Sequence, residues 1–268
     1  LTLVDAYSER EGYQYPSYFD AVVNEAIYTY DLSEEQILNK GYKIYTSLNQ
    51  DYQRAMDLAY ENDYLFQNAA DGTLLESGSV ALDPETGGVF AIFGGRKEHT
   101  FRGFNYATQM VRQPGSIIKP LAVYTVALEQ GYSIDSMLVD EPISYGKDKY
   151  TPENVDHEYE GEVPMYQALA ESKNTSAVWL LNEIGLNKGF KKVEEFGIPL
   201  TEGTEGDEYL GLALGGLSKG VSPLQMASAY STFANGGMMS EGHFITKIVD
   251  ATGAVIVDNT EPKTKKVT

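Results

Sequence analysis

Residues 112–131 read RQPGSIIKPLAVYTVALEQG, and they combine the pattern of a core helix with a chemically reactive first turn. The apolar positions leave almost no polar stripe, which is typical of a helix enclosed within a domain. They are Ile117, Ile118, Leu121, Ala122, Val123, Tyr124, Val126, Ala127 and Leu128. Pro114-Gly115 precedes the helix, and Pro120 falls in its first turn, where proline is tolerated. Gly131 stands where glycine commonly ends a helix, so we expect a central helix with firm boundaries.

Ser116 and Lys119 lie three residues apart at the start of this helix, a spacing that places both side chains on one face. A serine hydroxyl is a weak nucleophile at neutral pH and needs a neighbouring base. Lysine serves as that base only where burial lowers its pKa, and the apolar surroundings predict such burial. The alternative is a helix cap beside a surface lysine, because S-x-x-K alone occurs by chance in most chains of this length.

Composition excludes several classes of function. Among 268 residues, 42% are hydrophobic, which is enough for a substantial core. The formal net charge of −19 argues against binding of nucleic acid or of an anionic membrane through the chain's own surface. The chain has no cysteine, and its three histidines are far apart, so we expect neither a metal nor a cofactor. It contains no run of about 18 apolar residues and begins with Leu1, so we expect a fragment without signal peptide or anchor.

Periodicity predicts short helices and strands on both sides of the central helix. Helices are expected over 15–30, 33–39, 51–62, 165–172, 174–184, 189–198 and 223–235. Strands are expected over 42–48, over 79–82 and 88–93 as a hairpin, and on both sides of 251–253 as a second hairpin. Residues 132–163 read as loop-rich and could border a cleft, and 201–220 read as a glycine-rich run without phosphate-loop spacing. In the helix over 223–235 we expect a buried stripe, formed by Leu224, Ala227, Tyr230 and Ala234.

Ser172-Lys173-Asn174 stands between two of the expected helices. A tight turn that exposes a hydroxyl and a carboxamide suits substrate handling, since the serine can relay a proton and the asparagine can donate to a carbonyl. The alternative is ordinary capping, with Asn174 as the N-cap of the helix that follows. This triplet alone does not decide between the two interpretations.

The two motifs together are far less probable by chance, since S-x-x-K followed by S-x-N is typical of β-lactamases and penicillin-binding proteins. RQPGSIIKP, GSVALDPETGGVFAIFGG and SPLQMASAYSTFANGG closely resemble the transpeptidase domain of class A, bifunctional penicillin-binding proteins. The resemblance covers roughly residues 40–268. It implies an α/β (α+β) fold of the penicillin-binding-protein/β-lactamase type, with an antiparallel sheet packed against helices and a helical lobe. It also implies a linker module at 1–72, after an absent glycosyltransferase domain, and the transpeptidase domain at 73–268.

The resemblance implies that Ser116 is the acylated nucleophile, with its backbone N–H as one oxyanion donor, and that Lys119 is its base. Ser172 would relay a proton, and Asn174 would donate to the amide carbonyl of the substrate. The implied function is a D,D-transpeptidase that cross-links peptidoglycan stem peptides and is acylated by β-lactam antibiotics. Its parent would act at the cell surface, anchored in the cytoplasmic membrane. The alternatives are a β-lactamase or penicillin sensor and, from another class, a non-catalytic binding or scaffolding module.

One departure concerns the third motif of that family, because neither K-T-G nor K-S-G occurs in the chain. Lys263-Thr264-Lys265 is not that motif, and we read it as lacking a strand-like context. In the family that strand binds the substrate carboxylate and supplies the second oxyanion donor. We therefore expect an incomplete site with an unusually open Ser116, C-terminal strands missing, and a C-terminal segment or second chain that supplies them. Acylation by the fragment alone should be slow.

Overall fold

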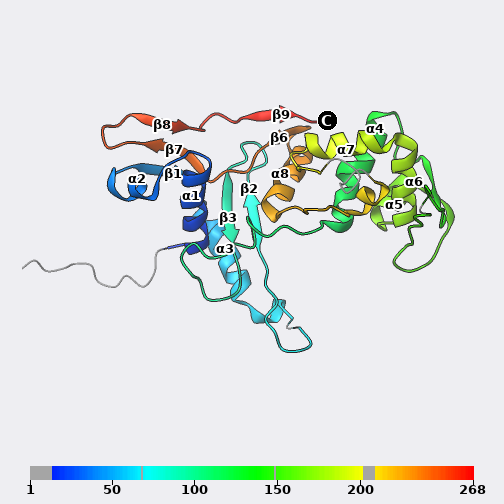
Figure 1. Cartoon of the computed structure of the whole chain (residues 1–268), viewed down its shortest axis with the longest axis horizontal. Helices are drawn as coiled ribbons and strands as arrows, with labels where there is room; N and C mark the ends of the chain where they lie inside the picture. The colour runs from blue at the N-terminus through cyan, green and yellow to red at the C-terminus, as the bar shows by residue number, and fades with distance from the viewer. Residues whose placement is uncertain (1–13, 68, 148, 202–208) are drawn as a thin grey trace, which may run out of the picture. The chain divides into compact units, whose positions relative to one another are not determined.

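The computed structural model describes residues 14–67, 69–147, 149–201 and 209–268, drawn in colour in Figure 1. The chain divides into two compact units. Unit 1 comprises Leu1–Met110, Ser222–Ser231 and Ser240–Thr264. Unit 2 comprises Val111–Val221, Thr232–Met239 and Lys265–Thr268.

In its described residues, unit 1 contains two small antiparallel sheets, three complete helices and the first part of a fourth, α8 (Pro223–Ala234). One sheet has the strand order β1-β7-β8, and β2 pairs with β3 in the other. The strands are β1 (Lys43–Thr46), β2 (Ser79–Leu82), β3 (Val89–Phe93), β7 (Ile245–Val249) and β8 (Val255–Asp258). The helical elements are α1 (Pro16–Tyr28), α2 (Glu34–Asn39), α3 (Gln50–Glu61) and the 3₁₀ turn η1 (Asp63–Leu65). Ser33 is the N-cap of α2 and forms a capping box, in which it exchanges hydrogen bonds with Gln36.

The core of unit 1 lies where α1 meets β3 and β7. Tyr18 is buried there, packs edge-on against the ring of Phe244, and donates a 2.7 Å hydrogen bond to the Val89 carbonyl. On α3, the buried Gln53 side chain makes two hydrogen bonds with the Ile92 backbone, one to its N–H and one to its carbonyl, each 2.9 Å long. A side-chain amide thus satisfies backbone groups of β3 that would otherwise be unpaired.

Unit 2 is mainly helical. Residues 115–129 form one helical run of three parts, namely η2 (Gly115–Ile118, 3₁₀), η3 (Pro120–Tyr124, π) and α4 (Thr125–Glu129). The strands β4 (Met137–Asp140) and β5 (Gly161–Pro164) pair antiparallel, followed by α5 (Met165–Ala170), α6 (Asn174–Ile184), α7 (Leu186–Glu195) and the 3₁₀ turn η4 (Leu210–Leu214). Helix α8 (Pro223–Ala234) begins in unit 1 and ends in unit 2, and the short strands β6 (Met238–Ser240) and β9 (Thr264–Lys266) pair with each other.

The mixed fold with antiparallel sheets, the two hairpins and the central helical run confirm the predicted fold class. Residues Leu121–Ala127 of the run are buried, whereas Ile117 and Leu128 are about half exposed, so the run is less enclosed than expected. The division at residue 72 remains a prediction. In the described part of the chain, no helix has both the length and the apolar character needed to cross a membrane.

Residues 132–163 are loop-rich, as expected, but they also contain β4 and the start of β5. These strands pair across a long sequence separation that local patterns do not show. Two other local expectations are wrong. Thr264–Lys266 is a strand, so our reading that 263–265 lacks a strand-like context is wrong; backbone pairing rather than side-chain pattern determines it. The predicted buried stripe of α8 is wrong, because Leu224, Ala227 and Tyr230 are only half-buried and Ala234 is exposed. The buried face includes Ser228 and Ser231, whose hydroxyls donate to carbonyls of their own helix and so tolerate burial.

Candidate active site

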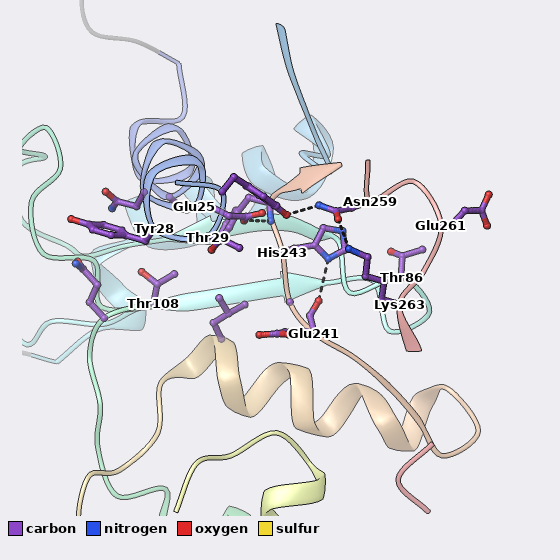
Figure 2. Close-up of a pocket in the computed structure, with 17 residues that line it drawn as sticks. Glu25, Tyr28, Thr29, Thr86, Thr108, Glu241, His243, Asn259, Glu261 and Lys263 are labelled. Atoms are coloured by element: carbon purple, nitrogen blue, oxygen red, sulfur yellow. Dashed lines mark hydrogen bonds between the residues drawn. The ribbon is translucent and has the colours of Figure 1, made fainter. Parts of the chain in front are cut away.

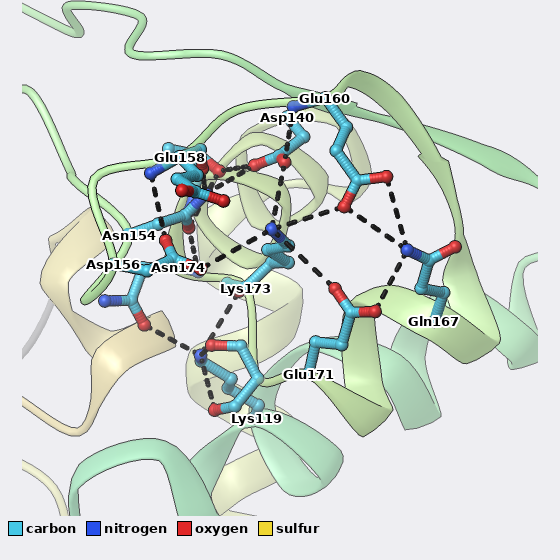
Figure 3. A network of polar contacts seen from close by, with 12 residues as sticks. Lys119, Asp140, Asn154, Asp156, Glu158, Glu160, Gln167, Glu171, Lys173 and Asn174 are labelled. Carbon is cyan, nitrogen blue, oxygen red and sulfur yellow. Dashed lines mark hydrogen bonds and ion pairs between the residues drawn. The ribbon is translucent and has the colours of Figure 1, made fainter.

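Lys119 is the centre of the candidate site in unit 2. Its side chain is only 1% exposed, and its ammonium group lies against the 172–174 turn. Nζ donates to Ser172 O at 2.6 Å and Oγ at 3.1 Å, to Lys173 O at 3.2 Å, and to Asn174 Oδ1 at 2.8 Å. Figure 3 shows these contacts as dashed lines from Lys119. The structure therefore brings Lys119, Ser172 and Asn174 together, although 53 to 55 residues separate them in sequence.

Burial lowers the pKa of Lys119 from 10.5 to about 8, because a charged ammonium loses its hydration in an apolar surrounding. The four acceptors oppose this effect, since each stabilises a proton on Nζ. A part of the Lys119 population is therefore neutral near physiological pH, as the sequence analysis predicted for a general base.

Ser116 lies in the 3₁₀ turn η2, just before Lys119, and is exposed. Ser116 is not among the four partners of Lys119 Nζ, so one of these contacts must give way before the amine can accept the serine proton. The backbone before the serine is tightly packed. A Cβ atom on Gly215 would lie 2.4 Å from the Gly115 nitrogen, closer than such atoms approach, so only glycine fits there.

The 172–174 turn closes α5. The Ser172 N–H donates to Leu169 O at 3.1 Å and the Lys173 N–H to Ala168 O at 2.9 Å, which together form a Schellman motif. Glycine usually occupies the left-handed position of that motif, but here it is Ser172, with φ of 57°. A non-glycine residue in this conformation costs about 1–3 kcal/mol, and such strain is typical of functional sites.

Asn174 is the first residue of α6, and Lys173 is its N-cap, without a side-chain capping bond. The capping alternative for Asn174 is therefore wrong. Its Oδ1 accepts from Lys119, and its Nδ2 donates to Glu153 O at 2.9 Å. An amide nitrogen carries two hydrogens, so one N–H remains for another acceptor.

The first turn of α6 is instead capped by Asn154, a residue that the sequence did not single out. Its Oδ1 accepts from the Asn174 N–H at 2.8 Å and the Thr175 N–H at 3.3 Å. Asp140 and Lys173 lie beside it, and both are buried. Sequence reasoning missed these groups because Asp140 and Asn154 lie in a segment of loop-like composition. The available signal was a carboxylate that directly follows the apolar run Leu138-Val139.

Unit 1 contains a separate cavity of about 500 Å³, lined by residues of α1 and the segment before β7 (Figure 2). Glu25 lies in its wall and accepts hydrogen bonds from the backbone N–H groups of Phe244, at 2.6 Å, and Ile245, at 3.2 Å. Burial raises the pKa of this carboxyl, and the two N–H groups partly oppose the rise. None of the four predicted site residues lines this cavity.

Comparison with known proteins gives a consistent result. The family described as penicillin binding protein transpeptidase domain matches residues 78–268. Penicillin-binding protein 2a of Streptococcus pneumoniae is 50% identical over 257 residues, which cover 92% of this chain and 34% of that protein. Penicillin-binding protein 1F of Bacillus subtilis is 45% identical over 252 residues, covering 92% of this chain and 33% of that protein. The chain thus spans about a third of the length of these relatives.

Solved structures agree. The penicillin-binding protein PonA1 of Mycobacterium tuberculosis superposes with a TM-score of 0.77 at 27% identity, covering 92% of this chain and 64% of that chain. The structure of PonA1 in complex with penicillin V gives a TM-score of 0.76 at 27% identity, covering 91% of this chain and 65% of that chain. With the family match over residues 78–268 and relatives at 45–50% identity, this chain belongs to the penicillin-binding protein transpeptidase domain family.

Proposed function

We propose that this domain is a serine acyltransferase of the D,D-transpeptidase type, which cross-links peptidoglycan stem peptides and is acylated by β-lactams at Ser116. The observation that carries the proposal is the buried Lys119, one helical turn from Ser116 and in contact with Ser172 and Asn174. The complex of PonA1 with penicillin V supports the β-lactam part, since that protein shares 27% identity with this chain.

In the first step, Ser116 Oγ attacks the carbonyl carbon between the two terminal D-alanine residues of a stem peptide. The neutral Lys119 amine takes the hydroxyl proton. Ser172 gives its own proton to the departing amine and is reprotonated by Lys119, with which it is in contact, so the lysine is neutral again when the step ends. The C–N bond breaks, the terminal D-alanine leaves, and an ester to Ser116 remains. Asn174 donates its remaining N–H to the substrate amide carbonyl. The backbone N–H of Ser116 stabilises the oxyanion.

In the second step, the amine of another stem peptide attacks the ester carbonyl. A new peptide bond forms, the amine gives up a proton, and Ser116 regains its hydroxyl. A β-lactam follows the first step only as far as ring opening, in which its own amide bond breaks and its nitrogen is protonated. The opened ring stays attached, so the ester persists.

Lys119 has two states in this scheme. As an ammonium it has three N–H groups for the acceptors of the 172–174 turn, and it has no lone pair for the Ser116 proton. As a neutral amine it retains two N–H groups for that turn and directs its lone pair towards Ser116. Deprotonation therefore makes the base and also frees it from one of its acceptors.

We also propose that the protein acts outside the cytoplasmic membrane, where peptidoglycan is assembled, and that its parent is membrane-anchored. Residues 1–72 would form a linker module and 73–268 the catalytic domain. The family match over 78–268 supports the second part of this division.

The test is covalent labelling of the full-length protein with a fluorescent penicillin, followed by mass mapping. The adduct is expected on Ser116, and Ser116→Ala should remain unlabelled while it unfolds at the wild-type temperature. Ser144→Ala, which changes an exposed serine elsewhere in unit 2, is the matched control and should label normally. Labelling that persists in Ser116→Ala contradicts the assignment. Rapid loss of the label would indicate a β-lactamase, and absence of labelling in the wild type a non-catalytic module.

A further inference from the structure

A buried polar network supports the 172–174 turn from the side opposite Lys119, as Figure 3 shows. Its members are Asp140, Asn154, Lys173 and Thr175, and none is more than 6% exposed. A buried polar group without a hydrogen-bond partner lowers the stability of the folded state. Each member of this network therefore depends on the positions of the others, and the network holds its side chains in one arrangement.

Asp140 is the last residue of strand β4, and the groups around its carboxylate are hydrogen-bond donors. Its Oδ1 accepts from Asn154 Nδ2 at 2.7 Å and from the Thr175 hydroxyl. Its Oδ2 accepts from the Glu160 N–H at 3.0 Å and lies 3.6 Å from Lys173 Nζ. These donors hold the pKa of Asp140 below its usual range, although burial acts in the opposite direction. An amide in its place would have to turn its own NH₂ group towards donors.

Asn154 transmits this constraint to the turn. Its Nδ2 faces two acceptors, Asp140 Oδ1 and Glu158 O, which lies 2.9 Å away. Its Oδ1 faces the N–H groups of Asn174 and Thr175. Only one orientation of the amide matches donors with acceptors, and Asp140 Oδ1 is one of the two acceptors that hold Nδ2 in it.

Lys173 provides the second connection. Its buried Nζ pairs with Asp140. The more exposed carboxylates of Glu160, at 3.4 Å, Glu171, at 3.7 Å, and Asp156, at 4.0 Å, also face it. Its backbone carbonyl accepts from Lys119 Nζ. A residue whose side chain is fixed by Asp140 therefore presents its carbonyl to the catalytic lysine.

We infer that Asp140 is a positioning residue for acylation, which acts through Asn154 and Lys173 to hold Ser172 and Asn174 against Lys119. The inference rests on the proposed function. It explains how a left-handed serine persists at this turn, since the two residues that follow it are both tied to Asp140, Lys173 by an ion pair and Asn174 through Asn154.

The experiment compares the acylation rate constants of variants of the full-length protein with a fluorescent penicillin. Asp140→Asn keeps the shape of the side chain but sets an NH₂ group against donors, and we expect a loss of about tenfold to a hundredfold, the effect of a shift near 1 Å. Its acylation should also reach half-maximum at a lower pH, because displaced carbonyls stabilise the Lys119 ammonium less. Asp156→Asn is the matched control, since it removes a carboxylate that faces the Lys173 ammonium but is not one of the groups that hold the backbone of the turn, and it should react at the wild-type rate.

A reciprocal exchange separates positioning from general destabilisation. Asn154→Asp alone places two carboxylates against each other and should be slow. The double variant, Asp140→Asn with Asn154→Asp, restores one donor–acceptor match in the reverse direction and should react faster than Asn154→Asp alone. If Asp140→Asn does not fold, the double variant and Asn154→Asp provide the same comparison.

The outcomes are distinguishable. A labelled wild type with Asp140→Asn at the wild-type rate overturns the positioning role alone. A double variant no faster than Asn154→Asp, or an Asp156→Asn variant as slow as Asp140→Asn, overturns it too. A wild type that is not labelled overturns the proposed function, and the positioning role with it.

Discussion

The pH dependence of Ser116 acylation should report the state of Lys119. Burial lowers the pKa of this lysine to about 8, so the deprotonated amine becomes available at a lower pH than for an exposed lysine. The neutral fraction is then roughly 0.1 at pH 7 and roughly 0.9 at pH 9. For a lysine with a pKa of 10.5 the neutral fraction at pH 7 would be only about 0.0003.

These fractions predict the shape of the rate profile. The acylation rate constant should rise about tenfold from pH 7 to pH 9 and then level off. An unshifted lysine would give a rise of about a hundredfold over the same interval with no plateau. Lys119→Arg should not acylate at any pH in this range, because guanidinium does not lose its proton there.

The assay is a time course of labelling with a fluorescent penicillin, in which samples are quenched at set times, at each pH from 6 to 10. Hydrolysis of the free β-lactam and thermal unfolding of the protein are measured at each pH as controls. A rate that continues to climb through pH 9, or one that does not change with pH, would refute a base of lowered pKa. Acylation of Lys119→Arg near the wild-type rate would refute the role of Lys119 altogether.

Two further substitutions test the packing around the site. Gly215→Ala places a Cβ atom 2.4 Å from the Gly115 nitrogen and should slow acylation by about tenfold or more. Gly131→Ala is the control, because Gly131 also has a positive φ but open space around the added Cβ atom. An equal loss of acylation rate in Gly131→Ala would contradict the steric argument. Gln53→Met removes both hydrogen bonds to the Ile92 backbone and should lower the free energy of unfolding by about 2–4 kcal/mol in urea titrations, without changing the acylation rate. An unchanged unfolding midpoint would show that water replaces the lost partners.

Local sequence patterns predicted the parts of the site that depend on helix geometry. The spacing of Ser116 and Lys119, and the apolar residues around them, were sufficient to expect a buried amine beside a reactive serine. Ser172 and Asn174 were identified because the turn residues and the helical periods on both sides are visible in the sequence. Their contacts with Lys119 follow from packing, and the family resemblance was needed to pair the two motifs.

The supporting network could not be predicted in the same way. Asp140 and Asn154 have the composition of loop residues, and their roles depend on partners 14 to 35 residues away. Lys173 would ordinarily be assigned to the surface, because a lone lysine gives no sign of the carboxylates that surround it. The division of the central helical run into 3₁₀, π and α parts likewise depends on tertiary packing, since its residues favour no particular helix type.

The π turn Pro120–Tyr124 has a consequence for chain length. The Thr125 N–H and hydroxyl both donate to Pro120 O, the hydroxyl at 2.8 Å, so the ring spans one residue more than an α-helical turn. Deleting one residue within 120–124 would restore the ordinary α ring and leave helix on both sides. Because five residues of a π turn cover about the same rotation as four residues of an α turn, the deletion would leave Ser116 near its present orientation relative to α4. Such a deletion should give a folded protein by circular dichroism that penicillin still labels, so this segment can lose one residue without losing the site, and a variant that folds but is no longer labelled would contradict this reading.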